Sequence, residues 1–212
     1  MNKKKTIVVA IILLLVLLVG GMLAYFTDTD TKANVFVLGD DIDISLNESS
    51  WDASNADGIH PGTTVAKDPV IKNESATTSA YVFAEVIVPC YATAGTTVDA
   101  PLFLLNDSTG NALSTTVGSS GNSGWTLIST SSVDASSKTI TYVYAWGSSS
   151  EMTTLAANTA TSAPVFSSVT LEPTLTVAQK DTVETSDIVV NAYGIQIDGL
   201  STSTPSSIYE LF

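Results

Sequence analysis

The sequence predicts an all-β protein with a jelly-roll-like β-sandwich fold, preceded by a cleavable N-terminal signal peptide helix. Two observations lead to this prediction. The chain begins with a basic and then an apolar segment, and an alternation of apolar and polar residues recurs through the rest of it. About eight to ten short strands separated by polar turns are typical of a β-sandwich.

The first 24 residues have the parts of a secretory signal peptide. Three lysines at positions 3 to 5 precede an unbroken apolar run at residues 7–19, and a glycine pair follows that run. Ala24 is a small residue at the expected cleavage position, so we expect a signal peptidase to cut between Ala24 and Tyr25 during export. The alternative is an uncleaved membrane anchor, because residues 7–24 reach the lower length limit of a membrane span.

The mature chain is expected to be one domain, residues 25–212, secreted to the cell surface or extracellular matrix. The whole chain has 8 Lys+Arg against 21 Asp+Glu and a net charge of −13. Such an acidic chain repels nucleic acid and anionic lipid, so we expect no nucleic-acid partner and membrane contact only through an uncleaved leader. The single cysteine, Cys90, excludes an intramolecular disulfide and is interpreted as a small, partly buried apolar residue.

Alternation identifies the strands of the first half of the domain. Residues 41–46 place Ile42, Ile44 and Leu46 on one face. Residues 63–73 read as one further strand, in which Pro69 requires an edge position or a bulge. Residues 80–89 are apolar on both faces and therefore predict a central strand.

The second half gives strand candidates at residues 100–105, 125–130, 138–146, 163–171 and 187–200. The polar turn at residues 131–137 predicts that the strands on either side of it pair. Residues 187–200 form the longest of the strand candidates. The glycine- and serine-rich stretch 108–124 is expected to be a mobile loop, and residues 204–212 a short closing helix.

Several stretches together resemble a family of secreted proteins from Gram-positive bacteria. The similarity is carried by GGMLAYFTDTDTKANVFVLGDDIDISL at the leader junction, HPGTTVAKDPVIKNESATTSAYVFAEVIVP in the middle, and PVFSSVTL and DIVVNAYGIQIDGL near the end. They are similar to the TasA and camelysin type proteins, whose leaders are processed by a dedicated (SipW-type) signal peptidase. The resemblance implies a jelly-roll-like sandwich that assembles head to tail with copies of itself into biofilm-matrix fibres.

The resemblance further implies that residues 25–38 insert as a donor strand into the next subunit. The alternation in this segment is compatible with that role, because one face is small and β-branched while the other carries charges in its first half. The assembly residues are Phe26 and the first face, which consists of Tyr25, Thr27, Thr29, Thr31, Ala33, Val35 and Val37. The alternative is that the segment is an ordinary first strand within its own sheet.

Catalytic, cofactor-binding and metal-binding residues are not predicted. Camelysin-like members are described as metallopeptidases, but a zinc peptidase usually needs two histidines about one helical turn apart, and this chain has only His60, in a loop. The acidic cluster Asp40, Asp41 and Asp43 is interpreted as a solvated strand face rather than a calcium site. We therefore expect a structural protein, with a monomeric or surface-held adhesin module as the alternative and a peptidase as a less favoured one.

Overall fold

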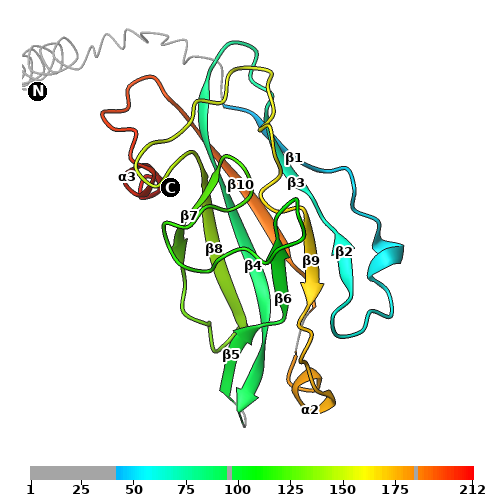
Figure 1. The fold of residues 1–212 in the computed structure, drawn as a ribbon. Helices are drawn as coiled ribbons and strands as arrows, with labels where there is room; N and C mark the ends of the chain where they lie inside the picture. The colour runs from blue at the N-terminus through cyan, green and yellow to red at the C-terminus, as the bar shows by residue number, and fades with distance from the viewer. Residues whose placement is uncertain (1–41, 95–96, 184–185) are drawn as a thin grey trace, which may run out of the picture. The chain divides into compact units, whose positions relative to one another are not determined.

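Strands form most of the regular structure in the computed structural model, which describes residues 42–94, 97–183 and 186–212 (Figure 1). The described residues lie within one unit, Gly39–Phe212. Their ten strands form three sheets, and the helices are single short turns. None of the helices among these residues is long and apolar enough to span a membrane. This confirms the predicted all-β class and is consistent with a β-sandwich.

The largest sheet has the order β10-β4-β8-β7, with β5 also pairing with β4. Its strands are β4 Ala80–Ala94, β5 Thr97–Pro101, β7 Trp125–Thr130, β8 Thr139–Trp146 and β10 Val189–Gln196. The strand predicted to be central is confirmed, because β4 is hydrogen-bonded to β10 on one side and to β8 on the other. The predicted pairing of β7 with β8 is also confirmed.

The second layer consists of two smaller sheets. One has the order β2-β9-β6, with β2 Thr64–Ala66, β6 Phe103–Asn106 and β9 Ser168–Leu171; the other pairs β1 Ile44–Glu48 with β3 Pro69–Asn73. The prediction of one strand over residues 63–73 is therefore wrong. Val65 pairs with β9 while Ile71 pairs with β1, and Pro69 begins the second strand, where its missing N–H is tolerated.

A single apolar core lies between these layers. Alternate residues of β4, including Val82, Ala84 and Val86, point into it and are fully buried, together with Tyr144 of β8 and Val169 of β9. A smaller cluster covers the other face of the large sheet. There Tyr81 and Phe83 of β4 pack with Ile208 of the closing helix α3, Pro205–Tyr209, which was predicted from the sequence.

Three details differ from the sequence predictions. The longest strand is β4, with 15 residues, and not the segment that contains β10. Leu46 is 36% exposed, although alternation places it on one face with Ile42 and Ile44, which pack against the core. The stretch 108–124 is held by backbone bonds, such as those of Leu113 to Leu105 and Gly118 to Leu127.

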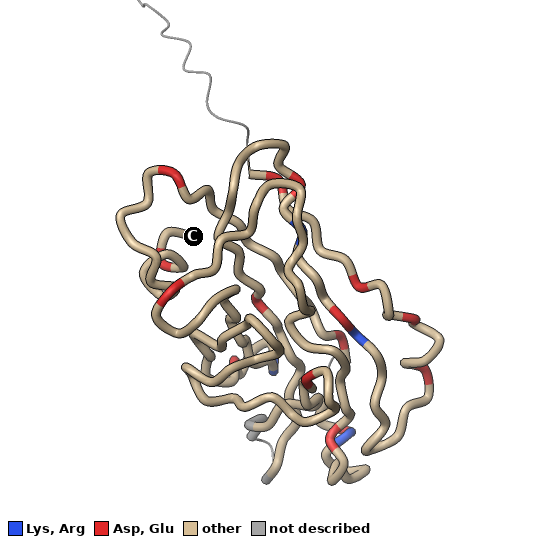
Figure 2. Tube along the Cα trace, turned by 45° about the horizontal axis from the view of Figure 1, so that its top comes forward, with Lys and Arg blue, Asp and Glu red and all other residues tan. Residues whose placement is uncertain are grey.

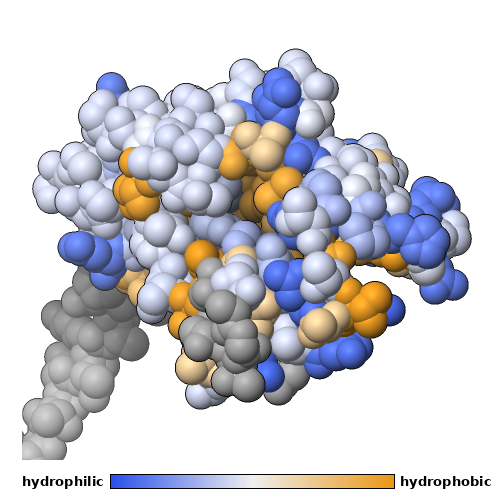
Figure 3. Space-filling view, turned by 60° about the horizontal axis from the view of Figure 1, so that its bottom comes forward, coloured by the Kyte–Doolittle hydropathy of each residue, from blue (hydrophilic) through white to orange (hydrophobic). Residues whose placement is uncertain are grey.

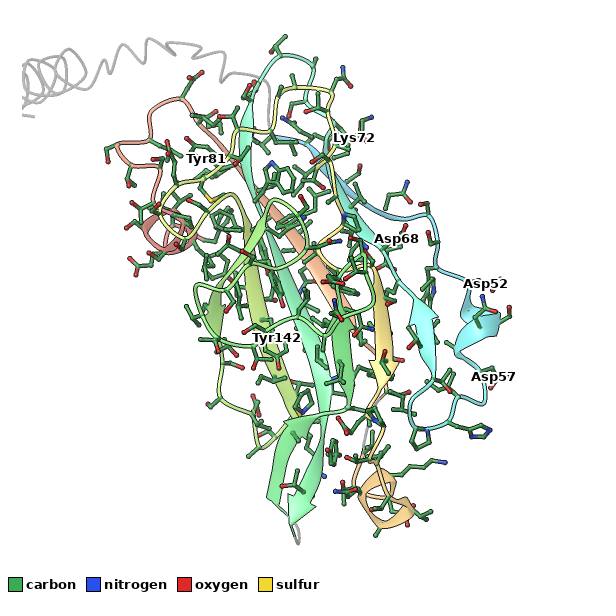
Figure 4. All side chains as sticks on the ribbon, viewed as in Figure 1. Asp52, Asp57, Asp68, Lys72, Tyr81 and Tyr142 are labelled. Atoms are coloured by element: carbon green, nitrogen blue, oxygen red, sulfur yellow. The ribbon has the colours of Figure 1, made fainter. Side chains whose placement is uncertain are left out.

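Two short helices lie in connections. The 3-10 helix η1, Ala53–Ala56, follows β1, and Figure 4 shows Asp52 and Asp57 at its two ends. Helix α2, Val177–Lys180, lies between β9 and β10 and was not predicted. Its signal was present in the sequence, since Thr176 and Gln179 form a capping box.

Candidate functional site: a groove beside two strand edges

The residues predicted to carry function fall mostly outside the described part of the chain. This applies to the cleavage residues Ala24 and Tyr25, to the donor segment at residues 25–38, and to Asp40 and Asp41. The described residues can instead be examined for a place that receives a strand. Such a place needs an apolar trough and at least one unpaired strand edge.

Two adjoining cavities form an apolar groove between the layers at one side of the sandwich. Their volumes are about 480 Å³ and about 430 Å³, and they share Ile59, Phe103 and Ser186. We call them together the edge groove. The first is also lined by residues that include His60, Pro61, Leu102, Leu171, Leu175, Val177, Lys180 and Val183, and the second by residues that include Trp51, Val65, Lys67, Val169, Asp187 and Ile188. Figure 3 shows apolar side chains around a hollow on the face that contains the bottom of Figure 1.

The strand β10, which follows the groove residues Ser186, Asp187 and Ile188 along the chain, has an edge that no described strand pairs with. The backbone N–H of Ile197 donates to Ser79 O (3.3 Å), in register with the pairing of β10 to β4. Bonded pairs in an antiparallel ladder recur at every second residue, so the odd-numbered residues of β10 bond to β4. The backbone groups of Val190, Ala192 and Gly194 therefore point away from β4, and no described strand pairs with them.

The strand β2 has a second unpaired edge, on the other wall. Leu171 N donates to Thr63 O (2.9 Å) and Lys67 N donates to Ser167 O (3.4 Å), which brackets the register of β2 with β9. By the same alternation, Val65 bonds to β9, whereas the backbone groups of Thr64 and Ala66 point away from it. No described strand covers this edge either.

The side chains along the groove are incompletely covered. Ile188, Val190 and Ala192 are directed to the core but remain only partly buried, and Trp51 is 38% exposed. Among the described residues, these apolar side chains are therefore only partly covered.

The wall of the groove near Trp51 is fixed by polar contacts. Ser50 donates from both its backbone N–H and its hydroxyl to Asp68, and Ser49 donates to the same carboxylate; Figure 4 labels Asp68 between β2 and β3. Burial opposes ionisation of Asp68, but these hydrogen bonds outweigh it and hold the pKa of that carboxyl below its usual value. Trp51, the next residue after Ser50, is thereby positioned at the groove.

One buried ion pair stands beside Trp51. Lys67 Nζ lies 2.7 Å from Glu48 Oε2 and 4.8 Å from the centroid of the Trp51 ring, and the two charged side chains are 10% and 20% exposed. The pair keeps the lysine neutralised, so this part of the groove carries no excess positive charge. Figure 2 shows how few basic side chains the described residues have beside many acidic ones.

His60 and Cys90 do not form a catalytic arrangement with each other. His60 is exposed in its loop at one end of the groove, whereas Cys90 is 1% exposed within β4, which confirms its interpretation as a buried apolar side chain. Among the described residues there is no group of three or more His, Cys, Asp or Glu side chains that could hold a metal ion.

The other face of the large sheet carries a polar cluster beneath α3. Glu85 accepts hydrogen bonds from Asn191 Nδ2 (2.9 Å) and from Tyr209 OH (3.2 Å). Burial, and then the negative charge of Glu85, raise the pKa of Tyr209 to about 12. These contacts fasten the closing helix to the sheet.

The class that the fold defines is an all-β protein, consistent with a β-sandwich, and its described residues enclose an apolar groove at one side. Residues 1–87 match the family model described as camelysin metallo-endopeptidase, and the match includes the predicted leader, the segment 25–38 and the strands up to the first half of β4. Comparisons with curated proteins and with solved structures gave no match. The first 87 residues are thus similar to camelysin, in agreement with the resemblance to the TasA and camelysin type.

Proposed function

We propose that this chain is a secreted structural protein that forms extracellular fibres by donor-strand addition. In this proposal a signal peptidase removes residues 1–24, and residues 25–38 of one copy then enter the edge groove of the next. The observation that carries the proposal is the groove itself, an apolar trough next to β2 and to the start of β10, two strands that each have one edge without a described strand partner. The similarity of residues 1–87 to camelysin supports it.

The chemistry of segment and groove is complementary. A strand that extends from the groove along β10 can bond to the outward-pointing backbone groups of Val190 and Ala192, and its alternate side chains can cover the partly buried apolar residues. Burying Val35 and Val37 contributes about 1.5–3 kcal/mol each. Because the donor and acceptor surfaces differ, each added copy presents a new groove, and the contact propagates into a filament.

The alternative of a surface-held adhesin module uses the same sandwich without self-assembly. It predicts a purified mature protein that remains monomeric at all concentrations. Fibre formation by the purified mature chain distinguishes the two functions.

A peptidase function, suggested by the description of the matching family, is not part of the proposal. The chain has one histidine, and His60 is an exposed loop residue with no helical histidine partner. Zinc peptidases usually use two histidines together with a third ligand, and this chain has only one histidine. We therefore propose a non-enzymatic role.

The test compares mature protein, residues 25–212, with the same protein lacking residues 25–38. Electron microscopy should show fibres of the first and none of the second, while circular dichroism shows that the truncated protein remains β-rich. An excess of free peptide 25–38 should also inhibit fibre growth by occupying grooves. Normal fibres of the truncated protein would refute the proposal, and so would outright unfolding, since the segment would then be the domain's own first strand.

A further inference from the structure

The first cavity of the edge groove has an apolar floor that is already buried. Leu102, Phe103 and Leu171 line it, and they are 3%, 7% and 8% exposed. Backbone bonds hold this floor in place, because Gly62 N donates to Leu171 O (2.9 Å) and Glu172 N donates to Leu102 O (3.0 Å). The volume of about 480 Å³ falls within the range of about 300–1,000 Å³ that is usual for small-molecule sites. The cavity is therefore preformed and has the size of a ligand pocket.

One wall of this cavity is α2, which is fixed on both sides. The capping box between Thr176 and Gln179 closes the first turn of the helix. Just after the last turn, the hydroxyl of Thr182 donates to Gln179 O (2.6 Å) and accepts from Ala92 N (3.0 Å), which ties the helix to the end of β4. These contacts position Lys180, the last residue of the helix, which lines the cavity.

The lining of this cavity differs in charge from the chain as a whole. The chain has 21 acidic and 8 basic residues, yet the described residues that line the cavity include a lysine and no Asp or Glu. Lys67 and Lys72 each form an ion pair with a glutamate, whereas Lys180 forms none with a described residue. The cavity therefore offers a positive charge that is not paired within the described part of the chain.

This charge lies at the mouth of the cavity. Lys180 and His60 both line the cavity and are both exposed. A lysine in such a position packs its aliphatic stem along the apolar wall and keeps its ammonium group in water. Val177, which is 78% exposed, adds an apolar side chain to the same lining. The arrangement combines an apolar interior with hydrogen-bond donors and a cation at the opening.

We propose that the first cavity binds a small amphipathic carboxylate, such as a fatty acid of medium length. The alkyl chain lies on the buried floor, and the carboxylate pairs with Lys180 at the mouth, where His60 can donate a hydrogen bond. Burial of each methylene group strengthens binding about four-fold, whereas an exposed ion pair contributes about two- to five-fold. The alkyl chain therefore provides most of the affinity, and Lys180 selects for the anionic head group.

Calorimetric titration of the mature chain with octanoate, octylammonium and acetate tests this site. The protein is kept below the concentration at which fibres sediment. The net charge of −13 favours the cation everywhere else on the chain, so a preference for the anion reports the local charge of the cavity. We expect octanoate to bind at one site per chain, at least about two-fold more tightly than octylammonium, and acetate not to bind. Equal or tighter binding of octylammonium, or no saturable binding of octanoate, overturns the proposal.

Substitutions assign the binding to this cavity. Lys180→Met keeps the stem and removes the charge, so it should weaken octanoate about two- to five-fold without weakening octylammonium. Leu175→Gln places an amide in the apolar lining and should weaken both amphiphiles. Lys72→Met is the matched control, because Lys72 lines neither cavity and lies near the top of Figure 4, whereas α2 is at the bottom of Figure 1. Octanoate binding that neither cavity variant changes places the site elsewhere and overturns the proposal.

The carboxylate site and the proposed fibre contact share this cavity, but their failures are distinguishable. Binding of octanoate below the fibre-forming concentration does not depend on the proposed function, whereas competition with the donor strand rests on it. Saturating octanoate should slow fibre growth, and the same concentration should slow growth of Lys180→Met less. Unchanged fibre growth with octanoate bound would exclude the donor strand from this cavity and leave the carboxylate site standing. Absence of fibres from the mature chain contradicts the proposed function alone.

Discussion

Replacing Ala192 by proline is expected to block assembly while preserving the fold. The N–H of Ala192 points away from β4, so proline removes no bond within the sheet, and proline is accepted on strand edges of this kind. A donor strand at this edge would lose one hydrogen bond, and the carbonyl that it presents would be buried without a partner. That costs about 1–3 kcal/mol, which raises the critical concentration for fibre growth by roughly 5- to 150-fold.

The assay is sedimentation of fibres over a concentration series, with thermal unfolding of the monomer measured beside it. Two further prolines provide the controls. Asn191→Pro removes an N–H that bonds to β4 and should lower the melting temperature of the monomer. Ala66→Pro tests the β2 edge in the same way as Ala192→Pro tests the β10 edge. If both edge variants assemble at the critical concentration of the unsubstituted protein, the donor pairs with neither edge and the reasoning fails.

Four other predictions concern the leader, the donor, the peptidase alternative and the core. N-terminal sequencing of the secreted protein should give a start within two residues of Tyr25; retention of Met1 would support the anchor alternative. Val35→Asp should prevent fibre growth because it buries a charge, whereas Lys32→Asp, on the opposite face, should alter only its salt sensitivity, as turbidity at two ionic strengths can show. Casein cleavage should be absent with and without chelator in both the unsubstituted protein and His60→Ala; chelator-sensitive cleavage that this variant loses would establish a peptidase. Burial, and then the charge of Cys90, raise the pKa of Tyr142 to about 12, against about 10 in the unfolded chain. The stabilisation that this group contributes is therefore complete below pH 10 and is lost between pH 10 and 12, by about 1.4 kcal/mol per pH unit. Urea unfolding of Tyr142→Phe over this pH range should show a smaller fall in the free energy of unfolding than urea unfolding of the unsubstituted protein.

The sequence predicted the elements whose signal is local. Residues 80–89 are apolar on both faces because β4 has a core on each side, and Tyr142, Tyr144 and Trp146 share a face because that face of β8 lies in the main core. The division of residues 63–73 into β2 and β3 could not be predicted in this way. The division depends on which strand each half pairs with. The first half, β2, pairs with β9, about 100 residues later in the chain, whereas the second half, β3, pairs with the preceding strand β1.

The groove was beyond prediction for the same reason. Its walls come from the residues around β2 and from those between α2 and β10, and no local pattern states that these segments face each other across an unfilled space. The partial burial of Val190 and Ala192 depends on which distant segments pack over them, and the local sequence does not state this. The donor segment, by contrast, was proposed from the resemblance to the TasA and camelysin type, and the local alternation of residues 25–38 is compatible with that role.

The proposed function gives a physical reason for placing a strand directly after a leader. While the leader is attached, the strand is held at the membrane and does not reach the groove of another copy. Cleavage between Ala24 and Tyr25 would release it, so cleavage would determine when assembly begins. Within this proposal the junction is direct because the new N-terminus is itself the part that assembles.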